Sequence, residues 1–452
     1  MLKKNDTYTI NIKNVTAKGF GIGHVGDYVL FVDGGLPGDR LAVRVLKVKP
    51  RYGYGKIQRI LRSSVHRIES PCPVSDRCGG CQWQHCDYQA QLGFKKDIVT
   101  DALVRIGGLS DVKVEDVIGM HVPQPYRNKA IFPVVPVGDE GFAIGMYAPR
   151  SHRIISVSMC AIQHPAHVPV LEVVREHMRQ YKIKAYDETT HSGLMRYILV
   201  RTSLATDEIM VAMIINGSGL PKENKLAAAL TSIRATTVLI NRHETKGNAV
   251  MGDDFRILSG EGFIRERIGA IWYQLSPPSF FQINPVQTAV LYDVAIKMAG
   301  LTGSEIVMDA HVGVGGVALM AAGQAKEVIG VDIVEEAIMD AEKNAEINGI
   351  GNAREVLDAV AAGRSPYHFI EFMACPGGCV GGGGSPIRGD NVVRTESIYR
   401  SDANNPVRRS HENREVLKLY KEYLVEPCGE KSHRLLHTRY VDRSGEVKNT
   451  AP

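Results

Sequence analysis

The stretch IVMDAHVGVGGVAL, residues 306–319, is the part of the sequence that decides most about the fold. It starts as an apolar run, passes through a glycine-rich loop and ends where a helical pattern begins. A second apolar run, VIGVDIV at residues 328–334, follows it. Strand, glycine loop, helix and strand in this order predict a βαβ unit of a nucleotide-binding α/β fold.

Four residues in and near this unit are candidates for cofactor binding. Gly313 and Gly315 allow a ligand to approach the backbone, and Asp332, near the end of the second run, is placed to bind a pair of ribose hydroxyls. A Gly-x-Gly loop alone is also typical of a structural turn. Together with Asp332 and the upstream Gln282, the loop favours S-adenosylmethionine as the ligand.

The N-terminal region, residues 1–62, is strongly basic and rich in β-forming residues. It holds twelve Lys or Arg residues and four Asp residues, a net charge of +8 within a chain of net charge +5. Short β-rich runs at residues 8–12, 27–32 and 40–45 are separated by glycine turns at 19–23 and 33–39. This pattern predicts a small OB-like barrel that binds nucleic acid, although a solvated basic face is the simpler alternative.

The eight cysteines are clustered rather than spread like a disulfide framework: Cys72, Cys78, Cys81, Cys86, Cys160, Cys375, Cys379 and Cys428. The N-terminus lacks an apolar signal core and no run of eighteen apolar residues occurs, so we expect a cytoplasmic protein that does not span a membrane. Clustered cysteines in such a chain indicate metal or redox chemistry.

Three thiols lie within ten residues, at Cys72, Cys78 and Cys81, with glycines that let the backbone curl around a ligand. Thiolates at this spacing bind zinc or an iron–sulfur cluster. Cys160 is the better candidate for a fourth ligand. Cys86 follows a bulky segment and is explained equally well as a packed thiol.

The expected organisation is a multidomain α/β and β protein. Alternating helical and strand patterns, with strand-like runs at residues 193–202 and 208–216, predict an α+β central domain. The expected parts are an N-terminal barrel (1–62), a cysteine-rich connector (63–95), the central domain (96–270), a Rossmann-like unit (271–350) and a C-terminal segment of different character (351–452).

Residues 1 to about 350 resemble the bacterial RNA (uracil-5-)-methyltransferases that act on 23S ribosomal RNA. The motifs that carry the resemblance are the basic barrel, the first cysteine cluster, PYRNK at 125–129 and FFQINP at 280–285. The resemblance implies a TRAM barrel, a [4Fe-4S] cluster, S-adenosylmethionine and a ribosomal RNA partner. By the resemblance, 63–95 is an Fe–S connector, 96–270 is an RNA-binding domain and 271–350 is a truncated Rossmann-like methyltransferase unit. It implies that the cluster ligands are Cys72, Cys78, Cys81 and Cys160, and that Arg127, Asn128 and Lys129 lie in the RNA groove, where an ordinary polar turn is the alternative.

The chain departs from this family at several positions. An aromatic–cysteine pair is usual where His311 and Val312 stand, a threonine is usual at Gly316, and Asp332 replaces a glutamate. His311 nevertheless occupies a cofactor-binding position by the resemblance. These changes weaken the expected contacts with the cofactor.

The chemistry of the family also requires residues that the chain does not contain. Uracil C5 is a poor nucleophile, so these enzymes add a thiolate to C6, methylate C5 and then remove a proton with a base. The family places the thiol in a Ser-Cys-Asn-Pro segment and shapes the pocket with Asp-Pro-Pro-Arg, and neither segment occurs here. We therefore assign no catalytic residue, and Cys428 lacks the surrounding motif.

From about residue 351 the chain resembles the C-terminal part of iron-only ([FeFe]) hydrogenases. The motifs are MACPGGC at 373–379, RRSHEN at 408–413 and HRLLHTRY at 433–440. The resemblance implies that Cys375 and Cys379 bind a cluster. Such a site needs four cysteines, so an empty or zinc-binding loop is the favoured alternative, and completion by a second chain is another.

Three functions therefore compete: an RNA methyltransferase of impaired activity, a non-catalytic RNA-binding Fe–S chimera, and a hydrogenase-related electron-transfer protein. The first 350 residues favour the first two. The missing upstream cysteines oppose the third.

Overall fold

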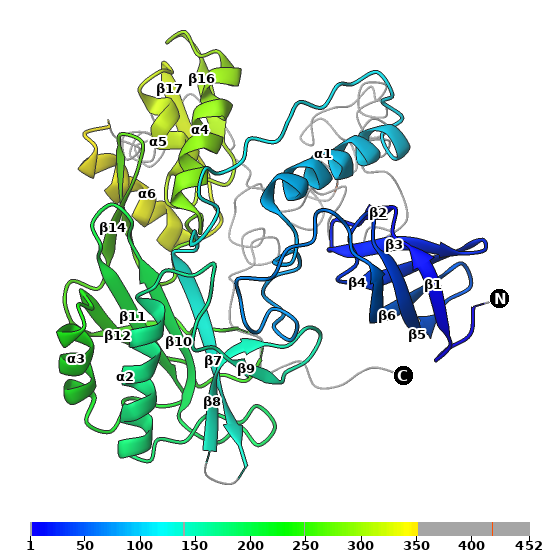
Figure 1. Ribbon diagram of the computed structural model, residues 1–452. Helices are drawn as coiled ribbons and strands as arrows, with labels where there is room; N and C mark the ends of the chain where they lie inside the picture. The colour runs from blue at the N-terminus through cyan, green and yellow to red at the C-terminus, as the bar shows by residue number, and fades with distance from the viewer. Residues whose placement is uncertain (1, 139–140, 248, 351–417, 419–452) are drawn as a thin grey trace. The chain divides into compact units, whose positions relative to one another are not determined.

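A computed structural model describes residues 2–138, 141–247, 249–350 and Lys418 (Figure 1). The chain divides into two compact units, Met1–His368 and Phe369–Pro452, and all described residues except Lys418 belong to the first. The expected hydrogenase-like segment lies almost wholly outside the described residues. No described helix is both long and apolar enough to cross a bilayer.

The N-terminal part is a six-stranded sheet with the order β1-β5-β6-β4-β3-β2. Its two end strands, β1 and β2, are separated by only two residues of the chain, so the sheet must curl back on itself. The buried side chains of Leu30, Val32, Leu41 and Val43 fill its interior. The strands are β1 (Thr7–Asn11), β2 (Asn14–Val15), β3 (Phe20–Val25), β4 (Tyr28–Asp33), β5 (Arg40–Val48) and β6 (Tyr52–Arg62).

Residues 19–23, expected as a turn, instead lead into and form most of strand β3. The glycines are there because the strand passes close to other parts of the chain. A Cβ atom on Gly21 would lie 2.7 Å from the carbonyl oxygen of Gly35, and one on Gly23 would lie 2.8 Å from Ile10 Cδ1. Glycine in a strand can mark a close approach of two backbones as well as a turn.

Buried Asp39 connects this sheet to the segment that follows it. One carboxylate oxygen accepts from the Leu36 backbone N–H at 2.8 Å and the other accepts from the Ser64 backbone N–H at 2.8 Å. Arg67 forms an ion pair with the same carboxylate. Helix α1 (Tyr88–Arg105) then begins at Asp87, whose side chain caps it by accepting from the Ala90 N–H.

The central part contains a seven-stranded sheet with the order β13-β12-β11-β10-β7-β8-β9. The strands are β7 (Lys129–Val137), β8 (Gly141–Tyr147), β9 (Ile154–Ser156), β10 (Met195–Thr202), β11 (Ile209–Ile215), β12 (Thr237–Arg242) and β13 (Asp254–Ser259). Helices α2 (His167–Gln180) and α3 (Glu223–Ser232) cover one face (Figure 1). The expected strand-like runs at 193–202 and 208–216 coincide with β10 and β11.

Alternate residues of β10 and β11 belong to two different hydrophobic cores. Ile198 and Val211 pack with α2 and α3, whereas Leu199 and Ala212 pack on the opposite face against the hairpin of β14 (Ile264–Ile268) and β15 (Ile271–Leu275). A sheet covered on both faces explains why β11 is apolar throughout and why β10 is buried at almost every position.

The glycine-loop unit follows the hairpin. Its elements are α4 (Pro285–Ala299), β16 (Ile306–Asp309), α5 (Gly316–Ala322), β17 (Glu327–Gly330) and α6 (Glu335–Ile347), with β16 and β17 parallel. Buried Asn344 on α6 connects the parts, since its side chain accepts from the Gln274 N–H at 2.6 Å and donates to the Val314 carbonyl at 3.0 Å. The expected mixed α/β architecture is confirmed, while the expected domain boundaries stay predictions.

Candidate cofactor and RNA site

The glycine loop between β16 and α5 is held in shape by Asp332. One carboxylate oxygen of Asp332 accepts from the Gly313 N–H at 2.9 Å, and the other accepts from the Val334 N–H at 3.0 Å. Gly313 and Gly315 have positive φ angles of 51° and 92°, which glycine adopts without strain. Among the described residues, apart from the two chain neighbours of Gly313, no atom lies within 4 Å of the position where a Cβ on Gly313 would stand, which leaves space there for a ligand.

Gln282 is connected to this loop through Tyr292. A hydrogen bond from Gln282 opposes the increase in the pKa of the Tyr292 hydroxyl that burial and nearby Asp309 cause. The same hydroxyl lies 2.6 Å from where a Cβ on Gly316 would stand, so a side chain at that position requires Tyr292 to move. Gln282 and Gly316 thus both lie near the Tyr292 hydroxyl, and the assignment of Gln282 to a cofactor site stays a prediction.

His311 lies at the exposed start of the loop, where its backbone N–H donates to the Asp309 carboxylate at 3.3 Å. Its side chain has no described contact that fixes it toward a ligand. Its assignment as a cofactor-binding residue stays a prediction.

Lys129 and Arg201 form a buried pair of cations on the central sheet. They lie opposite each other in the register of β7 and β10. Burial, and then the charge of Arg201, lower the pKa of Lys129 to about 7. Because this pKa is close to 7, both the charged and the neutral form of Lys129 are populated at neutral pH. Lys129 Nζ lies 3.4 Å from the carbonyl oxygen of Pro277.

Arg201 connects the central sheet to the glycine-loop unit. It is 1% exposed, and it donates to the carbonyl oxygens of Ser276 and Ser279. Ser276 in turn donates to Asp340 on α6 at 2.8 Å. Burial raises the pKa of Asp340, and the charge of Arg201 is among the effects that oppose this rise.

Asn128 and Arg127, the other two residues expected in the RNA groove, form hydrogen bonds within the protein. Asn128 is 3% exposed, and its side-chain amide donates to the Gln282 carbonyl at 3.4 Å. Arg127 donates through Nε to the Lys129 carbonyl at 2.9 Å. The segment therefore joins the central sheet to the FFQINP segment, and its contact with RNA stays a prediction.

The four cysteines expected to bind a cluster lie near one another. Burial raises the pKa of Cys81, and the thiols of Cys160, Cys78 and Cys72 raise it further. All four are free and partly exposed, whereas Cys86 is buried. Within the described ranges, no three His, Cys, Asp or Glu side chains are arranged to hold a single metal ion. A cluster at these thiols stays a prediction.

Sequence reasoning missed Arg201, Asn344 and Tyr273 as parts of this region. Tyr273 is fully buried, and its hydroxyl donates to the Gly316 carbonyl at 3.0 Å. A signal for Arg201 did exist, because a charged residue in the otherwise apolar run ILVRT requires buried partners. Nothing in the sequence indicates which partners these are.

Three family models match parts of the chain. The TRAM domain matches residues 2–57, the "iron only hydrogenase large subunit, C-terminal domain" matches 298–383, and the "iron hydrogenase small subunit" matches 391–443. The large-subunit match begins well before residue 351 and overlaps β16, α5, β17 and α6.

Curated relatives match most of the chain. An uncharacterized RNA methyltransferase of Halalkalibacterium halodurans is 43% identical over 357 residues, which cover 78% of this chain and 77% of the relative. Another, from Clostridium tetani, is 40% identical over 355 residues, with 78% and 76% covered.

A solved structure resembles the chain over a similar extent. It is the Pyrococcus abyssi tRNA (uracil-54, C5)-methyltransferase in complex with S-adenosyl-L-homocysteine. The TM-score is 0.59 at 27% identity, and the match covers 76% of this chain and 77% of that one.

Proposed function

Because the chain belongs to the family of RNA (uracil-5-)-methyltransferases that carry a TRAM domain, we propose that it binds 23S ribosomal RNA and S-adenosylmethionine without completing methyl transfer to uracil C5. One observation carries the second half of this proposal. No cysteine occurs between residues 161 and 374, the range that contains the whole described glycine-loop unit. The described glycine-loop unit therefore supplies no thiolate of its own to attack C6.

The described residues fit S-adenosylmethionine at the glycine loop. The ligand, when bound, supplies the methyl group. The open space over Gly313 admits it, and Asp332 keeps unused lone pairs for a ribose hydroxyl pair beyond the two hydrogen bonds that fix the loop. The solved relative bound to S-adenosyl-L-homocysteine adds support, since that molecule is the demethylated form of the same ligand.

The basic barrel and Lys129 support the RNA part of the proposal. Residues 1–62 carry a net charge of +8, enough to give a salt-dependent attraction to phosphate. Lys129 is the first residue of β7, and its Nζ lies 3.4 Å from the Pro277 carbonyl oxygen, in the segment that leads to Gln282. A phosphate bound at Lys129 would therefore lie beside that segment. The protonated form of Lys129 is the one that attracts phosphate.

Binding and transfer are measured separately to test the proposal. Unmodified 23S rRNA fragments are titrated in a fluorescence anisotropy assay, and S-adenosylmethionine is titrated by calorimetry. Transfer is then followed with methyl-labelled S-adenosylmethionine. We expect both ligands to bind and no label to reach uracil C5. Label at C5 would overturn the proposal of impairment, and absence of RNA binding would overturn the whole proposal.

We also propose that Cys72, Cys78, Cys81 and Cys160 bind a [4Fe-4S] cluster. Four free thiols that influence one another's pKa support this. Ligands of one zinc ion lie about 2.3 Å from the metal and therefore within about 4 Å of each other. A larger iron–sulfur cubane accepts thiols that are further apart.

A matched pair of variants tests the cluster. Anaerobically purified protein with Cys81→Ser is expected to lose most of its iron and its visible absorption, because it loses one of four ligands. Cys86→Ser, which replaces a nearby buried thiol, is expected to keep both. Equal loss in the two variants, or zinc in place of iron in the wild-type protein, would contradict the assignment.

The two hydrogenase matches favour electron transfer as a second function. Cys375 and Cys379 lie outside the described residues, as does any surface for a second chain that completes their site. Hydrogen evolution by the matured protein with a reduced viologen dye would support this function. Its absence would leave the RNA-binding function as the better account.

A further inference from the structure

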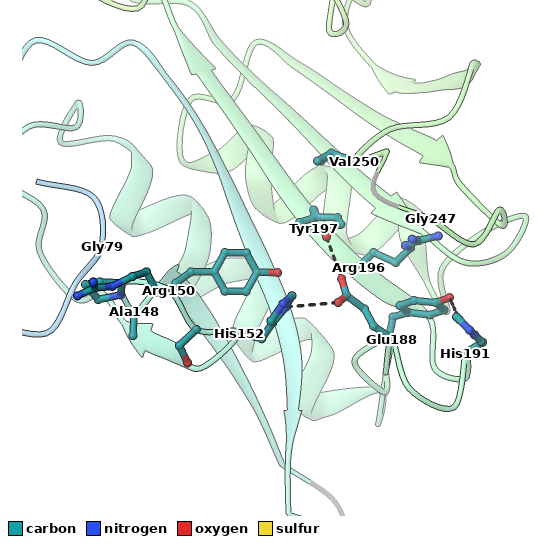
Figure 2. Close-up of a pocket in the computed structure, with 14 residues that line it drawn as sticks. Gly79, Ala148, Arg150, His152, Glu188, His191, Arg196, Tyr197, Gly247 and Val250 are labelled. Atoms are coloured by element: carbon teal, nitrogen blue, oxygen red, sulfur yellow. Dashed lines mark hydrogen bonds and ion pairs between the residues drawn. The ribbon is translucent and has the colours of Figure 1, made fainter. Parts of the chain in front are cut away.

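A pocket of about 710 Å³ lies at the edge of the central sheet, away from the glycine loop and next to the cysteine segment, which contributes Gly79 to its lining (Figure 2). It is formed by the end of β8, the loop after it, the segment before β10 and the start of β10. Three tyrosines line it, at positions 147, 186 and 197, together with Arg196, Glu188 and His152. Its volume is in the range of small-ligand sites, and its walls combine aromatic faces with charged edges.

A β-bulge at the start of β10 creates one wall of the pocket. The register with β11 changes from Met195 opposite Ile215 to Tyr197 opposite Ile214, so Arg196 is the extra residue. Met195 belongs to the core beneath α2 and α3, whereas Tyr197 packs with the core on the other face. Bulges redirect side chains in this way at functional positions.

Arg196 is a buried cation with unused hydrogen-bonding capacity. It is 4% exposed, and its guanidinium stacks over the ring of Tyr186 with 4.3 Å between carbon and ring centroid. One terminal nitrogen donates to the His243 and Thr245 carbonyls, but Nε has no acceptor among the described residues. A buried donor without a partner is costly, so a ligand with an acceptor would stabilise this arrangement.

Glu188 provides a negatively charged hydrogen-bond acceptor at the pocket edge, between Tyr197 and His152 (Figure 2). One oxygen accepts from the Tyr197 hydroxyl at 3.2 Å, and the other lies 3.7 Å from His152 Nδ1, too far for a good hydrogen bond. Burial raises the pKa of the Tyr197 hydroxyl, which therefore stays protonated and keeps donating to Glu188. The second oxygen is free to accept from a ligand.

The pocket lies on the sheet face that also carries Lys129. Tyr197 and Arg201 are both even steps from Leu199 along β10, so they point to the same side, and Lys129 is directly opposite Arg201. Four residues of strand separate Tyr197 from Arg201, about 13 Å. Leu199, between them, is fully buried under the β14–β15 hairpin, so an RNA that contacts both Lys129 and the pocket must pass around the hairpin.

We propose that this pocket is a subsite for an unpaired RNA base, with guanine favoured over the other bases. The inference rests on the proposed RNA-binding function and names the part of the RNA that the central domain recognises. Single-stranded bases are recognised by stacking on aromatic rings, which half-buried Tyr197 provides at the pocket wall. One Glu188 oxygen is free and the other keeps a second lone pair beside its bond from Tyr197, so the carboxylate can accept from the two adjacent N–H donors on the Watson–Crick edge of guanine. Arg150 and His152 at the rim suit the phosphates.

Coupling between one tyrosine and one base tests the proposal in the full-length protein. The probes are fluorescein-labelled RNA hairpins, each with a single abasic position in its loop, and affinity is measured by anisotropy. Tyr197→Ala is expected to weaken binding of the intact hairpin by about 5- to 100-fold. The loss is expected to disappear for one abasic position, because the base that stacks on Tyr197 is then already missing. Tyr181→Ala serves as the control. Tyr181 packs against the core beneath α2 and α3, away from the pocket, and its substitution is expected to change RNA affinity less than twofold.

Base preference is then measured at the coupled position with the four natural bases. We expect guanine to bind most tightly and Glu188→Gln to reduce its advantage over adenine. An equal loss for Tyr197→Ala at every abasic position, or no loss at all, would overturn the pocket as a base subsite. If the wild-type protein bound none of the hairpins, the proposed function itself would be wrong.

Discussion

The central sheet and the glycine-loop unit are built from similar apolar strands but are buried to very different degrees. Every residue of β11 is buried, and β10 is buried at all but one position. In β16, Ile306 is 55% and Met308 is 67% exposed. The central sheet has seven strands, whereas β16 pairs only with β17 in the described part of the chain.

This difference in burial distinguishes the region proposed to bind RNA from the region proposed to bind S-adenosylmethionine. A sheet packed on both faces is a rigid platform that holds Lys129, Arg201 and the pocket around Tyr197 in fixed positions. A Rossmann-type cofactor site normally belongs to a sheet of several strands. The described unit consists of the first strand, loop, helix and strand, so it carries the cofactor loop without the strands that follow in such folds.

Two methionines provide the strongest test of this contrast. Met213 on β11 is 0% exposed and Met308 on β16 is 67% exposed. Met213→Ala is expected to lower the free energy of unfolding by about 2–5 kcal/mol, because it opens a cavity in a packed core. Met308→Ala is expected to change it by less than about 0.5 kcal/mol. Urea unfolding of the full-length chain, followed by circular dichroism, measures both.

An equal cost for the two substitutions would contradict the contrast. It would mean that something covers the exposed side of β16 in solution, and the glycine-loop unit would then be as well packed as the central sheet.

Asp332 sharpens the comparison at the cofactor loop. Asp332→Ala removes the hydrogen bonds to the N–H groups of Gly313 and Val334. Because each bond involves a charged acceptor, we expect the affinity for S-adenosylmethionine to fall by about 10- to 100-fold while RNA affinity stays unchanged. Calorimetry measures the first and anisotropy the second. Glu336→Ala, an acidic residue at the start of α6, is the control, and an unchanged cofactor affinity in Asp332→Ala would remove Asp332 from the site.

Lys129 is expected to make a smaller, pH-dependent contribution to RNA affinity. Its pKa in the folded protein is about 7, far below that of a lysine in solution, so the charge is present below pH 7 and is lost as the pH rises through 7. RNA affinity is therefore expected to fall by roughly fivefold between pH 6 and pH 8, about the contribution of one phosphate contact. Lys129→Met is expected to bind RNA more weakly at pH 6 and to lose this part of the pH dependence. An identical pH profile in the variant would show that other groups cause it.

Several parts of the molecule follow from the sequence because local patterns determine them. The alternation and glycine spacing of residues 306–334 predict the loop, and Asp332 is indeed beside Gly313. The runs at 193–202 and 208–216 predict β10 and β11. Gly21 and Gly23 were misassigned to a turn, because the same residue type also permits the close strand contacts that β3 makes.

Other features depend on contacts between distant residues, which no local pattern specifies. Arg201 bonds to carbonyl groups more than seventy residues away, and Asn344 bonds to Gln274 across a similar separation. The bulge that redirects Arg196 arises from the pairing of β10 with β11 and leaves no mark in the sequence of either strand. The pocket around Tyr197 was therefore not predictable before the fold was described.

The most direct measurement follows methyl transfer under single-turnover conditions, with the protein in excess over an unmodified 23S rRNA fragment and with methyl-labelled S-adenosylmethionine. Both ligands are first shown to be bound in the same sample, and the RNA is then digested and its nucleosides separated. The proposed function predicts saturated RNA, bound S-adenosylmethionine and no labelled 5-methyluridine. Labelled 5-methyluridine would show that a thiol reaches the uracil after all, and it would contradict the central claim.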